Sequence, residues 1–330
     1  MVEVFPGIYW IKNPIGLDGS SLSHVNSYLV RGKDGYLLAD TGWNTEESFD
    51  ALCQSMAGIG ARVEDISQIV VTHIHPDHYG MAGRIKKLSG ARIYMHEIEN
   101  SIIDTRYVHM DALLRQTAEW LGRNGVPPEE TGDIRDASLE IVDLVVPVRP
   151  DVLLHGGETI TTGEHTFNVI WTPGHSPGHV CLYEPEKRVL LSGDHILPTI
   201  TPNIGRHPQS AENPLGMYLE SLCEMRRLHV SLVLPGHDEP FTGLVPRIDE
   251  MMRHHEQRNR EILAAVSRRP RTAFDIAEYV TWGKNAAWRD LPPLHRRMAI
   301  FETIAHLEYM IANGRAGKTE RNNVIYYRQR

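Results

Sequence analysis

The sequence has little cysteine and no long apolar run, and both absences narrow the class of protein. Its 330 residues include three cysteines, Cys53, Cys181 and Cys223, which are far apart and odd in number. This usage predicts small buried residues in a reducing compartment and argues against a disulfide framework or a thiolate metal site. No stretch of about 18 apolar residues occurs, so we expect no membrane span.

The first residues also lack a basic segment followed by an apolar stretch. We therefore expect no signal peptide and a cytoplasmic location. The net charge is −8, yet residues 250–330 carry 15 Lys and Arg against 9 Asp and Glu. This local excess of +6 indicates a second module, but it is too small to require a nucleic-acid partner.

The order of the predicted elements indicates an α/β fold. Short β-rich runs cover much of residues 1–72, and strands then alternate with helices. Residues 97–150 break this alternation with helical periodicity, and we expect one helix over 108–123 and another over 134–146. Strands return over 152–191. We therefore expect sheets with helices packed outside them, interrupted by a helical insertion.

The end of the chain is expected to form a small, mainly helical domain over residues 247–330, after a catalytic domain over residues 1–246. Helices are predicted over 247–267, 273–280 and 294–313, and a strand-like segment follows them.

Four side chains that can bind metals follow one apolar strand. In His73-x-His75-x-Asp77-His78 the first two histidines alternate, so they point the same way on extended backbone. Asp77 and His78 fall on the turn into a helix expected over 78–88, where their directions diverge. One face can therefore bind one ion and the turn a second. An isolated His-x-His pair carries little information, but this longer motif after a strand is much more specific.

Three further strand ends present side chains of the same kind. His175 and His237 each follow an apolar strand and a Pro-Gly turn, and Asp194 follows an apolar strand and a glycine. Each of these features alone is a weak signal, because such a histidine is usually an ordinary loop residue. A catalytic zinc usually takes three protein ligands and an open position, so the four strand ends together indicate a metal centre.

In combination, these motifs resemble the metallo-β-lactamase superfamily of hydrolases. Residues 37–42, Leu-Leu-Ala-Asp-Thr-Gly, match the early aspartate motif of that family through Asp40. The resemblance covers residues 1–245 and implies a four-layer αβ/βα sandwich with the metals at one edge, between the sheets. It also implies His73, His75 and His175 on one ion, Asp77, His78 and His237 on the other, Asp194 as the bridge, and Asp40 orienting a ligand imidazole.

Seven ligands exceed what one ion can use, so we expect two divalent ions. The set suits zinc, which we favour, and also iron or manganese. Bound metal lowers the pKa of water and supplies a bridging hydroxide as the nucleophile, and Asp77 is the candidate to carry the proton. The family includes true β-lactamases that use a cysteine ligand at the later aspartate position, so Asp194 argues against a dedicated β-lactamase.

Four other residues are candidates for the rim of the site. His24 and His207 lie on expected loops, and Trp43 lies beside the early aspartate motif. His179 follows His175 by four positions. The alternative for Trp43 is core packing, and for His179 it is a supporting or purely structural place in the loop.

The family likeness indicates the chemistry rather than the substrate. We expect hydrolysis of a small ester, thioester or lactone. Lactonases of this fold that act on acyl-homoserines usually carry a tyrosine where this chain has Leu197, which weakens the lactone. Two alternatives are a phosphodiesterase or endoribonuclease, and a mono-iron protein like the persulfide dioxygenases, which use fewer ligands than the seven found.

The C-terminal module resembles the winged-helix-like extension of some β-lactamase-like hydrolases, through residues 260–280 and 306–316. The helix expected over 294–313 is largely apolar, with few side chains for base edges. We therefore expect a lid, a packing element or a homo-oligomer contact, with nucleic acid less favoured. The 97–150 insertion is expected to shape a pocket for a small-molecule substrate.

Overall fold

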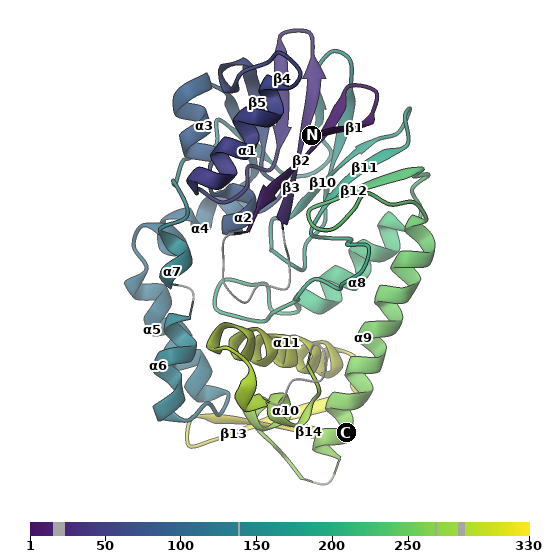
Figure 1. Ribbon diagram of the computed structural model, residues 1–330. Helices are drawn as coiled ribbons and strands as arrows, with labels where there is room; N and C mark the ends of the chain where they lie inside the picture. The colour runs from purple at the N-terminus through teal and green to yellow at the C-terminus, as the bar shows by residue number, and fades with distance from the viewer. Residues whose placement is uncertain (16–23, 138, 268, 283–287) are drawn as a thin grey trace.

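The computed structural model describes residues 1–15, 24–137, 139–267, 269–282 and 288–330. Two β-sheets face each other in the upper part of Figure 1, with helices on their outer faces. A mainly helical part lies below one end of the sheets, and its helix α11 (Pro293–Ala312) runs across that end.

The first sheet has a parallel half. Strand β4 pairs in parallel with β5, β5 with β6, and β6 with β7, whereas β1 to β4 are antiparallel neighbours. Parallel neighbours require crossover connections, and helices α1 and α3 provide them between β4 and β6. The strands of this sheet are β1 (Val2–Phe5), β2 (Ile8–Pro14), β3 (His24–Gly32), β4 (Gly35–Ala39), β5 (Ile66–Val70), β6 (Arg92–His96) and β7 (Val152–Leu154). The crossovers between β4 and β6 contain α1 (Glu46–Ala57), the 3₁₀ turn η1 (Val63–Asp65), α2 (Pro76–Tyr79) and α3 (Ala82–Ser89).

The second sheet has the strand order β12-β11-β10-β9-β8. Only β11 and β12 are parallel within it, and α8 (Pro214–Met225) lies between them in the chain. Its strands are β8 (Thr159–Thr161), β9 (Thr166–Trp171), β10 (Val180–Glu184), β11 (Val189–Gly193) and β12 (Leu232–Pro235).

Alternation along the strands explains the layers. Ile8 and Trp10 of β2 belong to the apolar cluster between the two sheets, whereas Tyr9 and Ile11 belong to the cluster under the outer helices. Successive strand residues point to opposite faces, so an uninterrupted apolar run can bury both faces. Strand β10 shows the same alternation on the other sheet. The expected four-layer α/β sandwich is confirmed.

Residues 97–150 are largely helical, but the helix expected over 134–146 is wrong. The helix there begins earlier, at Pro128, because the fixed φ of proline suits the first helical position. The helix expected over 78–88 is likewise two helices, α2 and α3. The segment contains α4 (Glu97–Tyr107), α5 (Asp111–Arg123), α6 (Pro128–Asp136) and α7 (Leu139–Val142).

The C-terminal part shares its core with this helical segment. Leu121 of α5 and Ile134 of α6 belong to the same buried cluster as Ile262, Ile304 and Met310. The domain boundary at residues 246 and 247 and the winged-helix likeness stay predictions. The C-terminal elements are α9 (Leu244–Val266), α10 (Ala273–Tyr279), the 3₁₀ turn η2 (Trp288–Asp290), α11, and the hairpin of β13 (Ala316–Arg321) and β14 (Val324–Gln329).

The expectation that the cysteines are small buried residues holds for Cys181 but not for Cys223. Cys53, Cys181 and Cys223 are all free thiols. Cys181 is buried in β10, but Cys223 is exposed, because it lies on the outer face of α8. Among the described residues, no helix has both the length and the apolar character needed to cross a membrane.

The shared core predicts that Leu121 of the helical segment stabilises the whole chain. Leu121 is fully buried, so Leu121→Ala should lower the free energy of unfolding by about 2–5 kcal/mol. Leu88→Ala is the matched control, because Leu88 is 46% exposed, and it should change stability by about 0.5 kcal/mol or less. Urea unfolding measures both, and equal effects would contradict the shared core.

Candidate metal centre

The ends of five strands meet at the edge of the sandwich that faces α11. Strand β5 leads into the His73 motif, and His175, Asp194 and His237 follow β9, β11 and β12. Asp40 follows β4 directly. The carboxyl ends of parallel strands lie at the same edge of a sheet, which explains why segments far apart in the sequence meet here.

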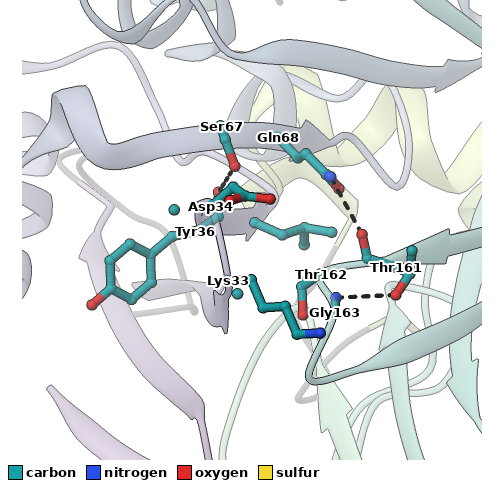
Figure 2. Close-up of a pocket in the computed structure, with 11 residues that line it drawn as sticks. Lys33, Asp34, Tyr36, Ser67, Gln68, Thr161, Thr162 and Gly163 are labelled. Atoms are coloured by element: carbon teal, nitrogen blue, oxygen red, sulfur yellow. Dashed lines mark hydrogen bonds between the residues drawn. The ribbon is translucent and has the colours of Figure 1, made fainter.

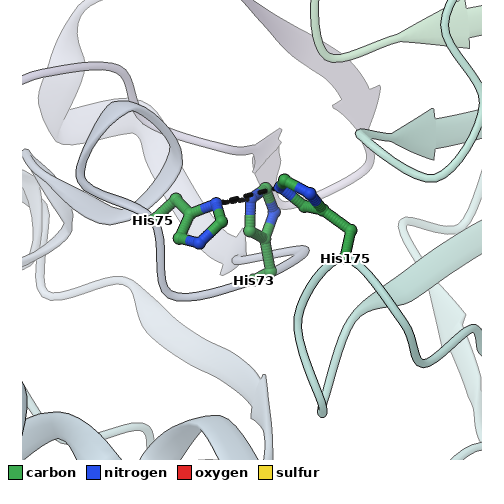
Figure 3. A group of neighbouring side chains, drawn as sticks. All are labelled: His73, His75 and His175. Carbon is green, nitrogen blue, oxygen red and sulfur yellow. Dashed lines mark hydrogen bonds between the residues drawn. The ribbon is translucent and has the colours of Figure 1, made fainter. Parts of the chain in front are cut away.

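Three histidines form the first group of candidate ligands. His75 Nδ1 lies 2.9 Å from His73 Nε2 and 2.9 Å from His175 Nε2, and Figure 3 shows the three rings converging. Burial, followed by the charges of neighbouring histidines, holds the pKa of His73 and His75 well below the usual value. Neutral rings keep a lone pair, which is the form that binds a metal ion.

The second group contains Asp77, His78 and His237. His237 Nε2 lies 3.3 Å from Asp77 Oδ2, and His78 Nε2 lies 3.7 Å from the same oxygen. Asp194 lies between the groups: its Oδ1 is 3.3 Å from His78 Nε2, and its Oδ2 is 3.4 Å from His237 Nε2 and 3.6 Å from His175 Nε2. The structure therefore brings all seven predicted ligands together.

Outer contacts fix which ring nitrogen of three histidines carries the proton. His78 Nδ1 faces Asp40 Oδ2 at 2.8 Å, and His175 Nδ1 faces the carbonyl of Asn203 at 2.9 Å. His237 Nδ1 faces the carbonyl of His24 at 3.2 Å. Each Nδ1 must donate a hydrogen to these oxygens, so in the neutral ring each Nε2 is left bare and points into the site.

Two buried atoms at the centre test whether a metal suits this arrangement. Among the described residues, His78 Nε2 and Asp194 Oδ1 have no hydrogen-bond partner. Despite its burial, the Asp194 and Asp77 carboxylates raise the pKa of His237 to about 10, which shows how strongly the site favours a positive charge. Despite burial, the carboxylates of Asp194, Asp77 and Asp40 also raise the pKa of His78 well above its usual value. The buried carboxylates thus favour positive charge in this space, from protons or from metal ions, and the residues suit a pair of divalent ions.

Asp40 also fixes the start of the His73 motif. Its Oδ1 accepts a hydrogen bond from Thr72 N and its Oδ2 accepts one from Thr72 Oγ1, both at 2.8 Å. The imidazole contact that the resemblance implied for Asp40 corresponds to the contact with His78 Nδ1, and the orienting role stays a prediction. Gly236 allows the close packing beneath the centre, since a Cβ at this position would collide with Asp194 Oδ1.

Glu99 of α4 is a supporting residue that sequence reasoning missed. Its Oε1 accepts hydrogen bonds from Ser176 Oγ at 2.6 Å and Gly178 N at 2.5 Å, and its Oε2 accepts one from Ile74 N at 3.0 Å. One buried carboxylate thus joins the loop of His73 and His75 to the loop of His175. No motif marks it, because a glutamate near the start of a helix is ordinary in sequence.

The loop of residues 194–213 is held from the C-terminal part. Asn203, whose carbonyl orients His175, donates from Nδ2 to Glu302 Oε2 of α11 at 2.7 Å. Arg247 of α9 donates to the carbonyls of Leu197 and Ile200 at 2.6 and 2.7 Å. These contacts place α11 beside the metal centre, and no motif in the sequence points to them.

The four predicted rim residues separate into two kinds. His24 and His207 keep partial exposure near the site. Trp43 is buried, which corresponds to the core-packing alternative. His179 is not on the rim: it is fully buried, its Nδ1 lies 2.8 Å from Thr172 Oγ1, and its Nε2 accepts a hydrogen bond from Asp194 N at 3.1 Å. It therefore supports the backbone of the central aspartate from behind.

A surface hollow of about 210 Å³ lies far from this centre. It is lined by the turn of Lys33 and Asp34 and by Thr161 and Thr162 (Figure 2). These residues precede or begin strands whose other ends carry the candidate ligands. The hollow is therefore at the opposite end of the sheets.

Among the described residues, three overlapping groups of side chains that could each hold a metal ion lie at one edge of an αββα sandwich, and one of them joins Asp194 to His73 and His78. This arrangement indicates a metallohydrolase. The comparisons then specify the family. A family model described as the metallo-beta-lactamase superfamily matches residues 21–237, and the chain belongs to that superfamily.

Similar proteins cover most of the chain. The probable metallo-hydrolase YqjP of Bacillus subtilis is 26% identical over 314 residues, which are 91% of this chain and 92% of the relative. A metallo-beta-lactamase family protein from Thermus thermophilus has a structure that is 30% identical, with a TM-score of 0.83 over 99% of this chain and 100% of that one. The protein named acyl-coenzyme A thioesterase MBLAC2 of Gallus gallus is 30% identical, over 71% of this chain and 79% of the relative.

The geometry predicts two ions per chain. His75→Ala and His237→Ala should each reduce the metal content from two ions to about one, because each variant removes a ligand from a different group. Elemental analysis of purified protein by mass spectrometry measures this. His155→Ala, which changes a histidine that is 56% exposed, should retain both ions. One ion in the unchanged protein, together with a fully active His237→Ala variant, would reject the pair.

Glu99→Gln should weaken metal binding without touching a ligand. The amide presents a donor to one of the groups that now donate to Glu99, and a supporting group of this kind typically contributes about 10–100-fold in metal affinity. Competition with a chelator measures the effect. Glu97→Gln is the matched control, since Glu97 is 52% exposed. Equal affinities in the two variants would show that Glu99 does not position the ligands.

Proposed function

We propose that the chain hydrolyses a small ester, thioester or lactone, with a pair of zinc ions as the favoured cofactor. The observation that carries the proposal is the convergence of bare ring nitrogens and carboxylate oxygens on two adjacent positions that share Asp194. Among these substrates we favour thioesters, because a relative that is 30% identical is named an acyl-coenzyme A thioesterase.

The proposed ligands are assigned by group. His73, His75 and His175 would bind one ion, and Asp77, His78 and His237 the other. Asp194 would serve both, because its oxygens lie beside His175 of the first group and His78 and His237 of the second. When bound, a metal pair lowers the pKa of water to near neutrality and stabilises charge on the attacking and leaving atoms.

Asp77 is the residue that we assign to proton transfer. Its side chain is 17% exposed, compared with 9% for Asp194 and 0% for His78. It is therefore more open to water and substrate than these two neighbours. In thioester hydrolysis, a carboxylate oxygen of Asp77 would accept the proton that the attacking water releases and return it to the departing thiolate.

The contacts of α11 support a small-molecule substrate. Phe301 O of α11 accepts a hydrogen bond from Arg206 N at 2.9 Å, and Asn203 binds Glu302 on the same helix. The helix thereby holds the loop that orients His175, and it runs across the end of the sandwich that carries the candidate ligands (Figure 1). This arrangement favours a small substrate over a nucleic acid, which is the alternative that the assay below also tests.

The test is a substrate panel on metal-loaded protein. We expect turnover of thioesters, and we expect Asp77→Asn, which keeps an oxygen at the ligand position but cannot accept a proton as a carboxylate does, to lower kcat by about 10²–10⁴-fold. Because Asp77 is also a proposed ligand, the rate of the variant is compared per bound metal. Lactones, phosphodiesters, RNA and β-lactams complete the panel. The proposal fails if RNA or a phosphodiester is cleaved and no ester, thioester or lactone is. One iron per chain with oxygen uptake on a persulfide would favour the dioxygenase-like alternative.

A further inference from the structure

Three segments meet around His207, next to the first histidine group. Gln209 Nε2 donates to Thr105 Oγ1 at the end of α4 at 3.0 Å. The ring of His207 lies 5.7 Å from that of Phe301, in the middle of α11. Asn203, earlier in the same loop, orients His175. We call this place, where the end of α4, residues 203–209 and the middle of α11 come together, the His207 junction.

Two arginines approach the His207 junction from opposite elements. Arg106 follows Thr105 on α4 and precedes Tyr107, whose hydroxyl donates to Ile74 O, between His73 and His75. Arg297 lies one turn before Phe301 on α11. Both arginines are partly exposed. Burial and then the charges of Arg106, Arg206 and Arg297 lower the pKa of His207 to about 3, so that this histidine is neutral.

Neither Arg106 nor Arg297 has a carboxylate partner among the described side chains. Arg297 Nη1 donates to the carbonyl of Arg135 at 3.0 Å. Asp136, whose charge reaches Arg297, is already bound by Arg135 at 2.6 Å. By contrast, the adjacent Arg296 forms an ion pair with Glu130, with Nη1 at 2.9 Å from Oε2.

These unpaired charges are unfavourable on their own. Burial and the charge of Arg106 lower the pKa of Arg297 to about 10, which means that the surroundings oppose its positive charge. The whole chain carries a net charge of −8, yet the charge of Arg106 reaches both Arg297 and the candidate ligand His75. An anion between the two guanidinium groups would relieve the repulsion. The planar guanidinium donates two parallel hydrogen bonds to a carboxylate or a phosphate.

We infer that Arg106 and Arg297 together bind an anionic group of the substrate, a phosphate or a carboxylate, on the His175 side of the metal centre. The inference rests on the proposed function and narrows its substrates to anionic thioesters. The anion has two sources in such a molecule: phosphate on the thiol that leaves, or a carboxylate at the far end of the acyl chain.

Three thioesters test the inference on metal-loaded protein. Hexanoyl-coenzyme A carries phosphates on the thiol, the adipoyl thioester of N-acetylcysteamine carries a carboxylate on the acyl chain, and the hexanoyl thioester of N-acetylcysteamine is neutral. Arg106→Gln and Arg297→Gln should each lower kcat/KM for one anionic thioester at least tenfold more than for the neutral one. The substrate that responds identifies the source of the anion.

Two further variants test whether the loss of selectivity comes from the lost charge or only from a change in local structure. Arg297→Lys retains the charge and should recover part of the lost selectivity. Arg62→Gln changes an exposed arginine that precedes β5, at the opposite end of the sheet, and should leave the selectivity unchanged. The inference is overturned if Arg106→Gln and Arg297→Gln both keep the wild-type ratios of kcat/KM among the three substrates.

The inference can fail separately from the proposed function. If no ester, thioester or lactone is cleaved, the proposed function fails, and calorimetric binding of inorganic pyrophosphate to metal-loaded protein still tests the arginines. Binding should be at least tenfold weaker in Arg106→Gln and Arg297→Gln than in the unchanged protein or Arg62→Gln. Equal affinity in all four proteins would overturn the anion site.

Discussion

The Asp194 carboxylate, buried between two groups of histidines, is the interaction on which the site depends. Its two oxygens lie within 3.3–3.6 Å of ring nitrogens of His78, His175 and His237. A buried carboxylate of this kind is costly without positive charge beside it. The imidazoles around it are directed at the same space, and Asp194 raises the pKa of His78 and His237 despite their burial. The space therefore favours positive charge, from protons or from metal ions, and this makes it a candidate metal centre.

The loops that carry the ligands are held by parts of the chain without metal motifs. Glu99 of α4 binds three donors from two ligand loops, and Glu302 of α11 binds Asn203, which orients His175. Loops are the most mobile parts of a fold, so a precise site needs such outer contacts. The helical segment and the C-terminal part therefore act as the frame of the metal centre as well as its neighbours.

Sequence reasoning succeeds where the signal is local. The His73 motif and the turns before His175, Asp194 and His237 combine a ligand type with a strand end, and the family's recurrent motifs supply the rest. It fails where a residue has two local interpretations. Pro128 is as typical of a helix end as of the helix start that it forms in α6, and the spacing of His179 suits a rim position as well as its actual place behind Asp194.

The sequence by itself determined the fold class and marked the seven converging side chains, because strand patterns, turn residues and ligand chemistry are local features of short segments. Asp40 was marked only through the family resemblance. Only the tertiary structure decided which side chains support them and which stay unpaired. Arg296 has a partner and Arg297 has none among the described carboxylates, although the two are neighbours in the sequence. The partners that make this difference lie more than 160 positions earlier in the chain. The difference therefore depends on how α6 packs against α11.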